Sequence, residues 1–315
     1  MGGAAGSLSD LIGRDVTMTS GTPGANGRDG IAYPAIRAKE ITGTGYTNGT
    51  GIVESRDVTY DGVLANLAEK LSRTYGVSVY YGTSLYNPFK NLSYKKKYIM
   101  EQQLDYTTLM KQAQFLMYTL SQMPRNSLRE VGYLSGSQVS IYLCKKITSG
   151  TGTNILGLTS EANRVWFATF ETEVRGVYYG GYFNIMLHEF VHVFNYNLTA
   201  TEQKNLASSV AAWNYGLSYK STNSTERVYG VSGKYDETNS CFLSGYSRKA
   251  AMEDIAETVS VISTFSSLEP PLTEGTNIRR KYDFLVATFA AKFETLSAFA
   301  TKGSLFAYRH LFDEA

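Results

Sequence analysis

Apolar positions recur with a regular period only beyond residue 56. The segment 1–56 is rich in Gly, Thr and Ser, and its apolar residues follow neither a helical nor a strand spacing. Glycines recur at every third position from Gly21 to Gly30, but so few triplets cannot form a stable triple helix. We therefore predict a flexible or extended N-terminal segment over 1–56 and a folded domain over 57–315. A short trimerising stub is the alternative for the glycine triplets.

Three elements are predicted at the start of the folded domain. A helix is expected over 61–72 with Asp61 as its N-cap, and the alternating residues 77–81 predict a strand. Apolar residues three to four apart predict a long helix over 99–122, which Pro124 ends. The apolar stripe of this helix consists of Leu104, Leu109, Ala113, Leu116 and Leu120.

Two strands and then only helices are predicted in the remainder of the chain. The apolar runs 139–144 and 164–170 predict the two strands. Helical periods cover residues 182–196, 202–215, 248–264 and 277–302. In the last of these helices the inward side chains are expected to be Tyr282, Leu285, Phe289 and Phe293. The order of elements predicts an α+β fold.

The most informative stretch of the helical half is His188-Glu189-Phe190-Val191-His192, which holds two of the three histidines of the chain. Residues four apart on a helix lie one above the other, so both imidazoles can bind one cation. Glu189 projects from the flank of that face and is the candidate general base toward a metal-bound water. The alternative is a buried helix with two hydrogen-bonded histidines, which must place these polar groups on an apolar helix without a metal.

A hydrolytic zinc site needs a third protein ligand besides the two imidazoles. A third histidine six residues on is absent, because Leu198 stands there. The better candidates are Glu253 and Glu257, which lie four apart on the predicted helix 248–264. One carboxylate could bind the metal and the other could orient a ligand imidazole, and spacing alone leaves the choice open. An exposed acidic helix face is the alternative for this pair.

These motifs together resemble the gluzincin zinc metallopeptidases. The pentapeptide, followed by Ser244-Gly245-Tyr246 and then Glu253-Asp254-Ile255-Ala256-Glu257, is similar to the group that includes the anthrax lethal factor catalytic domain, the Pro-Pro endopeptidases and zinc-binding peptidases of gut bacteria. The resemblance implies one Zn²⁺ ion held by His188, His192 and Glu253. It also implies that Tyr246 assists the transition state and that Glu257 supports a metal ligand. The group often has a glycine where this chain has Val191.

The same resemblance implies a zincin-like fold and a function. The fold would place a small mixed sheet over the active-site helix, with a mostly helical C-terminal half, and residues 164–170 are the expected edge strand for substrate. The predicted function is zinc-dependent endopeptidase activity on a peptide or protein substrate, with Glu189 as general base. The alternative is a catalytically inactive zincin-fold structural protein, or a binding protein associated with a surface or a virion.

The composition and net charge of the chain limit the classes of partner and the location that we expect. A net charge of +2 with 18% charged residues argues against a nucleic-acid partner held by bulk electrostatics. No apolar run reaches the roughly 20 residues of a membrane span. The low charge and the 24 tyrosines favour an extracellular or cell-surface location, with any export signal removed ahead of Met1, and a virion-associated protein is the alternative. Cys144 and Cys241 are a candidate disulfide pair.

Overall fold

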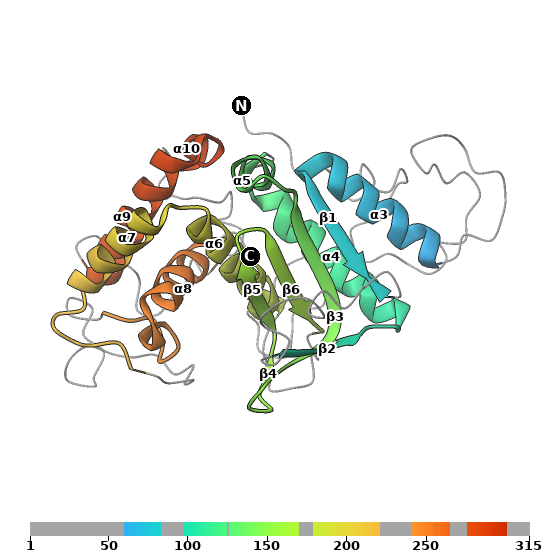
Figure 1. Ribbon diagram of the computed structural model, residues 1–315, viewed down its shortest axis with the longest axis horizontal. Helices are drawn as coiled ribbons and strands as arrows, with labels where there is room; N and C mark the ends of the chain where they lie inside the picture. Colours follow the sequence, from blue (N-terminus) through green and yellow to red (C-terminus); the bar gives the residue numbers. More distant parts are fainter. Residues whose placement is uncertain are drawn as a thin grey trace, which may run out of the picture. The chain divides into compact units, whose positions relative to one another are not determined.

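The structure is a computed structural model, and it describes residues 60–82, 98–124, 126–169, 179–220, 241–264 and 276–300 (Figure 1). The chain divides into two compact units, Met1–Phe183 and Asn184–Ala315. A mixed sheet lies in the first unit, and the second unit is mostly helical, so the predicted α+β class is confirmed. The predicted N-terminal segment 1–56 lies outside the described residues.

The first unit is built around the long strand β3 (Val139–Ser149) (Figure 1). Its first half pairs in parallel with β1 (Val77–Tyr81) and with β6 (Arg164–Ala168). Its second half pairs antiparallel with β2 (Tyr98–Gln102) and with β4 (Asn154–Ile155). The predicted strands 77–81, 139–144 and 164–170 therefore exist, and together they form the parallel part of the sheet.

Residues 164–168 form an internal strand, so the expectation of an edge strand there is wrong. β6 is hydrogen-bonded to β3 on one side and to the antiparallel strand β5 (Gly157–Glu161) on the other. A turn at 162–163 joins β5 to β6, and β5 is the strand at this end of the sheet. The sequence pattern does not indicate β5, because Gly-Leu-Thr-Ser-Glu contains a single large apolar residue.

Aromatic rings stack across the three parallel strands. The register places Tyr80 of β1 beside Tyr142 of β3, and Tyr142 beside Trp166 of β6. The ring centroids of these two pairs are 4.9 and 5.0 Å apart, with nearly parallel planes. Each such pair contributes about 0.5–1.5 kcal/mol beyond the burial of its area. Val165, Trp166 and Phe167 are all fully buried, which is typical of parallel strands covered on both faces.

Among the described residues of the first unit, three helices pack against this sheet, and the first of them agrees closely with its prediction. α3 (Tyr60–Tyr75) packs on β1 and buries Leu64, Leu67 and Leu71. It begins at Tyr60, so Asp61 lies within its first turn and is not the N-cap residue. The short helix α5 (Ser127–Ser135), which packs on β1 and β3, was not predicted from the sequence.

The predicted helix over 99–122 is wrong in its first third. Residues Tyr98–Gln102 form strand β2, and the helix α4 (Tyr106–Gln122) begins only after Asp105. The Asp105 carboxylate accepts a hydrogen bond from the backbone N–H of Thr108 at 3.0 Å, which caps α4 and separates it from the strand. Leu104 lies ahead of this cap and is 59% exposed, whereas the other residues of the predicted stripe are buried.

The described residues of the second unit contain α6 from Asn184 onward, followed by four further α-helices. α6 (Tyr179–Tyr196) begins just before the boundary between the units. It is followed by α7 (Ala200–Ala212), α8 (Ala251–Thr264), α9 (Asn277–Lys292) and α10 (Glu294–Ala300). α8 packs against α7 and α9 (Figure 1). The helical periods of the sequence thus predicted every α-helix of this part of the described chain, with shifted bounds.

The C-terminal helix is interrupted once, and its buried face is as predicted. α9 ends at Lys292, the next residue Phe293 has an extended backbone, and α10 starts at Glu294. Tyr282, Leu285, Phe289 and Phe293 are all at most 1% exposed. The Phe293 ring packs against Phe194 of α6 with 5.2 Å between the ring centroids, which joins α6 to this end of the unit.

Two further predictions concern the cysteines and a membrane span. Cys144 and Cys241 are both buried, and no disulfide joins them, so the candidate pair is not formed. Within the described ranges, the search for a helix of sufficient length and apolarity to traverse a bilayer found none.

Gly76 connects α3 to β1 at a position where both conformation and packing require glycine. Its φ is 70°, and a Cβ placed there would lie 2.8 Å from the Cβ of Arg129 on α5. Gly136, which follows α5, has a similar φ of 75°, but a Cβ there would meet no atom within 4 Å. Substitutions at the two glycines therefore separate the free-energy cost of a positive φ from that of a steric clash.

Replacing Gly136 by Ala should lower the free energy of unfolding by about 1 kcal/mol, because only the left-handed conformation is penalised. Gly76→Ala should cost about 1–3 kcal/mol more, since the backbone must also move away from Arg129. Urea unfolding of the full chain measures both values. Equal losses of unfolding free energy in the two variants would contradict a steric clash between a Cβ at position 76 and Arg129.

Candidate metal centre

The site is built on α6, a helix that is buried on most of its surface. Leu187, Phe190, Val191, Val193 and Phe194 are all 0% exposed. A helix covered on so many sides also buries its polar residues, and the side chains of the H-E-x-x-H motif lie in the interior as a result. Buried imidazoles and carboxylates are costly unless each finds a partner.

The polar row of α6 faces α8, and the contacts show that the two helices run antiparallel. The side-chain amide of Asn184 donates a hydrogen bond to the Ser260 hydroxyl at 3.2 Å. Two turns further along α6, His192 lies near Glu253, seven residues before Ser260 on α8. Asn184, His188 and His192 are spaced by four residues, so one row of side chains along α6 meets α8 along its length.

Three ligand atoms converge where these helices meet. Nε2 of His188 lies 3.0 Å from Nε2 of His192 and 3.1 Å from Oε2 of Glu253. The third side of this triangle, from His192 Nε2 to Glu253 Oε2, measures 3.4 Å. The two histidines are 8% exposed, and the Glu253 side chain is 19% exposed. The chain thus brings together the two imidazoles and the distant carboxylate that the sequence singled out.

The triangle has the dimensions of a set of metal ligands. Around a tetrahedral zinc ion with bonds of about 2.0–2.1 Å, the ligand atoms lie about 3.3 Å apart. All three observed separations are within about 0.3 Å of this value. Two imidazole nitrogens and one carboxylate oxygen suit zinc, and imidazole also binds copper, nickel and iron. These three residues form a group that could hold a metal ion.

The charges around His188 favour a cation. Burial would lower the pKa of its imidazole, but the hydrogen bond to Glu253 and the nearby carboxylate charges raise it. Those charges belong to Glu189, Glu253 and Glu257. Burial would likewise raise the pKa of Glu253, but its hydrogen bonds with the two histidines outweigh burial and lower it. The three carboxylates concentrate negative charge beside the two imidazoles, and a divalent ion would offset it.

Tyr246 lies beside this group on the segment that precedes α8. Its ring centroid is 5.9 Å from that of His188, and the ammonium of Lys249 lies 4.9 Å from the Tyr246 ring centroid. Burial raises the pKa of the Tyr246 phenol, and so do the charges of Glu253 and Glu189. The hydroxyl therefore stays protonated and remains a hydrogen-bond donor.

A pair of serines shapes the turn that carries Tyr246. The backbone N–H of Ser247 donates to the Ser244 hydroxyl oxygen, and the N–H of Ser244 donates to the Ser247 hydroxyl oxygen, each at 3.0 Å. The short helix η4 (Ser247–Lys249) follows this turn, and Ala250 is extended before α8 begins. This break divides the predicted helix 248–264 and sets Tyr246 apart from the axis of α8.

Glu257 has a partner that the sequence did not suggest. Its carboxylate accepts a hydrogen bond from the Ser244 hydroxyl, and its charge acts on His188. Burial raises the pKa of Glu257, and the bond from Ser244 opposes that shift. The carboxylate expected to support a metal ligand therefore also holds the turn that carries Tyr246.

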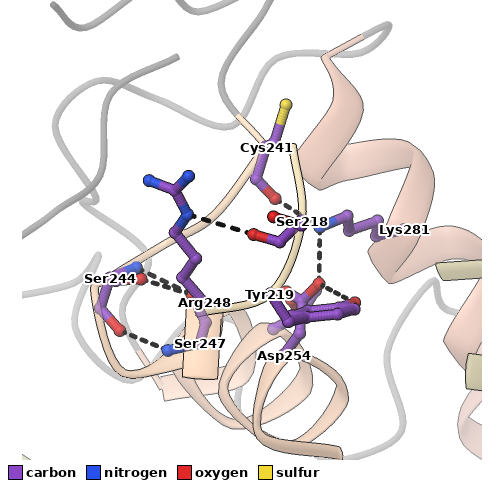
Figure 2. A network of polar contacts seen from close by, with 9 residues as sticks. Ser218, Tyr219, Cys241, Ser244, Ser247, Arg248, Asp254 and Lys281 are labelled. Atoms are coloured by element: carbon purple, nitrogen blue, oxygen red, sulfur yellow. Dashed lines mark hydrogen bonds and ion pairs between the residues drawn. The ribbon is translucent and has the colours of Figure 1, made fainter. Parts of the chain in front are cut away.

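A second buried network lies next to the first and was not predicted from the sequence (Figure 2). Lys281 of α9 and Asp254 of α8 are both 0% exposed, and the Lys281 ammonium lies 2.7 Å from Oδ2 of Asp254. The Tyr219 hydroxyl donates to the same oxygen at 3.0 Å. One signal could have revealed it, because Lys281 is a charged residue on a face of α9 that also presents Ile278 and Leu285.

Comparisons with known proteins add no assignment. No family model matches this chain, and searches of curated proteins and of solved structures gave no match either.

If the triangle binds a metal, Glu253→Gln should weaken zinc binding by at least about 100-fold, because a neutral amide replaces an anionic ligand of the same shape. Loss of a group that only supports a ligand already costs about 10–100-fold. Competition with a chromophoric chelator measures the zinc Kd. The matched control is Glu294→Gln on α10, which replaces an exposed carboxylate and should leave the zinc Kd unchanged. Equal zinc affinity of Glu253→Gln and the wild-type chain would contradict the ligand assignment.

Proposed function

We propose that this chain is a zinc-dependent endopeptidase of the gluzincin type. The proposal is carried by one observation, the convergence of His188, His192 and Glu253 ligand atoms within 3.4 Å of one another. Glu189 follows the first ligand on α6 and is 7% exposed, so its carboxylate belongs to the same buried site. The spacing of these residues is that of the gluzincin motif, which supports membership of that family.

The ligand count supports a catalytic rather than a structural ion. Structural zinc sites are closed by four protein ligands, whereas catalytic sites use three and leave one position for water or substrate. Within the described ranges, the metal-capable group consists of three residues. Two further groups that can transfer or donate a proton belong to the same site, since the Glu189 charge acts on His188 and the Tyr246 ring lies beside His188. Neither group would have a task in a structural centre.

Each residue of the site has its own role in peptide hydrolysis. His188, His192 and Glu253 would hold the ion, which when bound supplies an acidic water and polarises a carbonyl. Glu189 takes the proton of the attacking water and returns it to the leaving amine. Tyr246 donates its hydroxyl proton in a hydrogen bond to the carbonyl oxygen as that oxygen becomes negative, and stabilisation of this charge is commonly a major part of the rate enhancement in acyl transfer.

The substrate in this proposal is a peptide or protein that the enzyme meets outside the cell or at its surface. Low charge content and the 24 tyrosines support that location, and the near-neutral net charge of +2 argues against nucleic acid. A catalytically inactive binding protein of the same fold would keep the metal and cleave nothing.

Glu189→Gln should lower kcat for peptide cleavage by about 10²–10⁴, because general acid–base catalysis is lost. Zinc stoichiometry should not change, since Glu189 is not a ligand in this scheme. The measurement is mass-spectrometric profiling of a broad peptide library with the zinc-loaded full chain, and Glu294→Gln serves again as the control. Cleavage by Glu189→Gln at near the wild-type rate would refute its role as the base. A zinc-loaded wild-type chain that cleaves no peptide would favour the inactive binding protein.

A further inference from the structure

Lys281 makes all its described polar contacts in the interior of the second unit (Figure 2). Its ammonium donates hydrogen bonds to the Asp254 carboxylate and to the backbone carbonyl oxygen of Cys241. The same ammonium lies 4.6 Å from the centroid of the Phe242 ring, at the distance of a cation–π contact. A lysine is almost never fully buried unless it is paired in this way.

These contacts join α9 to two elements that carry the candidate site. Asp254 is the neighbour of Glu253 on α8, and Cys241 begins the segment that leads to Ser244 and Tyr246. One ammonium on α9 therefore connects the helix of the third ligand to the segment of the tyrosine. The Asp254 carboxylate is further fixed by the Tyr219 hydroxyl at 3.0 Å and by the Thr258 hydroxyl at 3.3 Å.

Stability alone does not account for this arrangement. Desolvating two charges costs several kcal/mol, and apolar residues of similar size are often as stable or more stable in place of a buried ion pair. An ion pair with directed hydrogen bonds does fix the rotation of a helix. A rotation of α8 by about 20° would move a carboxylate roughly 6 Å from its axis by about 2 Å. Metal ligands tolerate errors of only about 0.2 Å.

We propose that Lys281 is a positioning residue for the metal centre. Through Asp254 it sets the rotation of α8 that presents Glu253 to the two imidazoles, and through Cys241 it holds the Tyr246 segment beside them. This inference rests on the proposed metal site, but it does not depend on the reaction that the site catalyses.

The test separates positioning from stability with three variants of the full chain. Lys281→Met leaves the Asp254 charge buried without its cation, so its thermal midpoint should fall. The double variant Lys281→Met/Asp254→Leu removes both charges, and its midpoint should recover most of that loss. Lys292→Met is the matched control, because Lys292 also lies on α9 and forms an ion pair, at 3.1 Å, but its partner is Glu202 beyond the site.

The readouts are the zinc Kd and the visible absorption spectrum of the cobalt-substituted chain, which reports coordination geometry. The double variant should bind zinc at least about 10-fold more weakly than the wild-type chain, with an altered cobalt spectrum, although it is stably folded. Lys292→Met should match the wild type in both. A folded double variant with a zinc Kd within about twofold of the wild type would overturn the proposal.

A milder variant decides the question if the double variant does not fold. Tyr219→Phe removes one hydrogen bond to Asp254 and keeps the ion pair, so the zinc Kd should rise by about threefold or more. An unchanged Kd in that variant would then overturn the proposal. A wild-type chain that binds zinc but cleaves no peptide contradicts the proposed peptidase and leaves this inference standing, whereas a wild-type chain that binds no divalent metal contradicts both.

Discussion

Burial of negative charge is the constraint that the second unit must satisfy. Glu189, Glu253 and Glu257 all act electrostatically on His188 inside the protein, and Glu253 is in hydrogen-bond contact with both imidazoles. Carboxylates in such surroundings need cations or hydrogen-bond donors, because water cannot solvate them fully. A divalent ion held by the imidazoles and Glu253 would meet this need, and the positive charge of that ion would lower the pKa of a water bound to it.

Helix α8 meets the constraint on two adjacent faces with two pairs of residues spaced by four. Glu253 and Glu257 face the candidate centre, where the partners are histidines and the Ser244 hydroxyl. Asp254 and Thr258 are one position further along and belong to the Lys281 network. Any rotation of α8 would disturb both sets of contacts together. The chemistry of the site and the packing of the helices are therefore coupled through one element.

Local patterns predicted most of the elements and the candidate site residues. The errors arose where a local signal was overlooked or where contacts distant in sequence decide the structure. The H-E-x-x-H spacing and the Glu253–Glu257 spacing are properties of single helices, so the candidates for the converging residues could be found without a structure. The spacing left open which of the two carboxylates would be the ligand, and the family resemblance implied Glu253. The Asp105 cap was overlooked because the apolar spacing continues through it. β5 forms the end strand of the sheet because it pairs with β6, and its own sequence pattern does not predict a strand. Lys281 was passed over because its partners, Asp254 and the Cys241 carbonyl, are distant in sequence.

The central claim is that two imidazoles and one distant carboxylate enclose a single ion. Zinc K-edge X-ray absorption of the zinc-loaded full chain measures that coordination most directly. We expect a shell of nitrogen and oxygen atoms at about 2.0–2.1 Å, with the outer scattering of two imidazoles and no sulfur. A sulfur shell near 2.3 Å, or an oxygen shell without imidazole scattering, would contradict the claim.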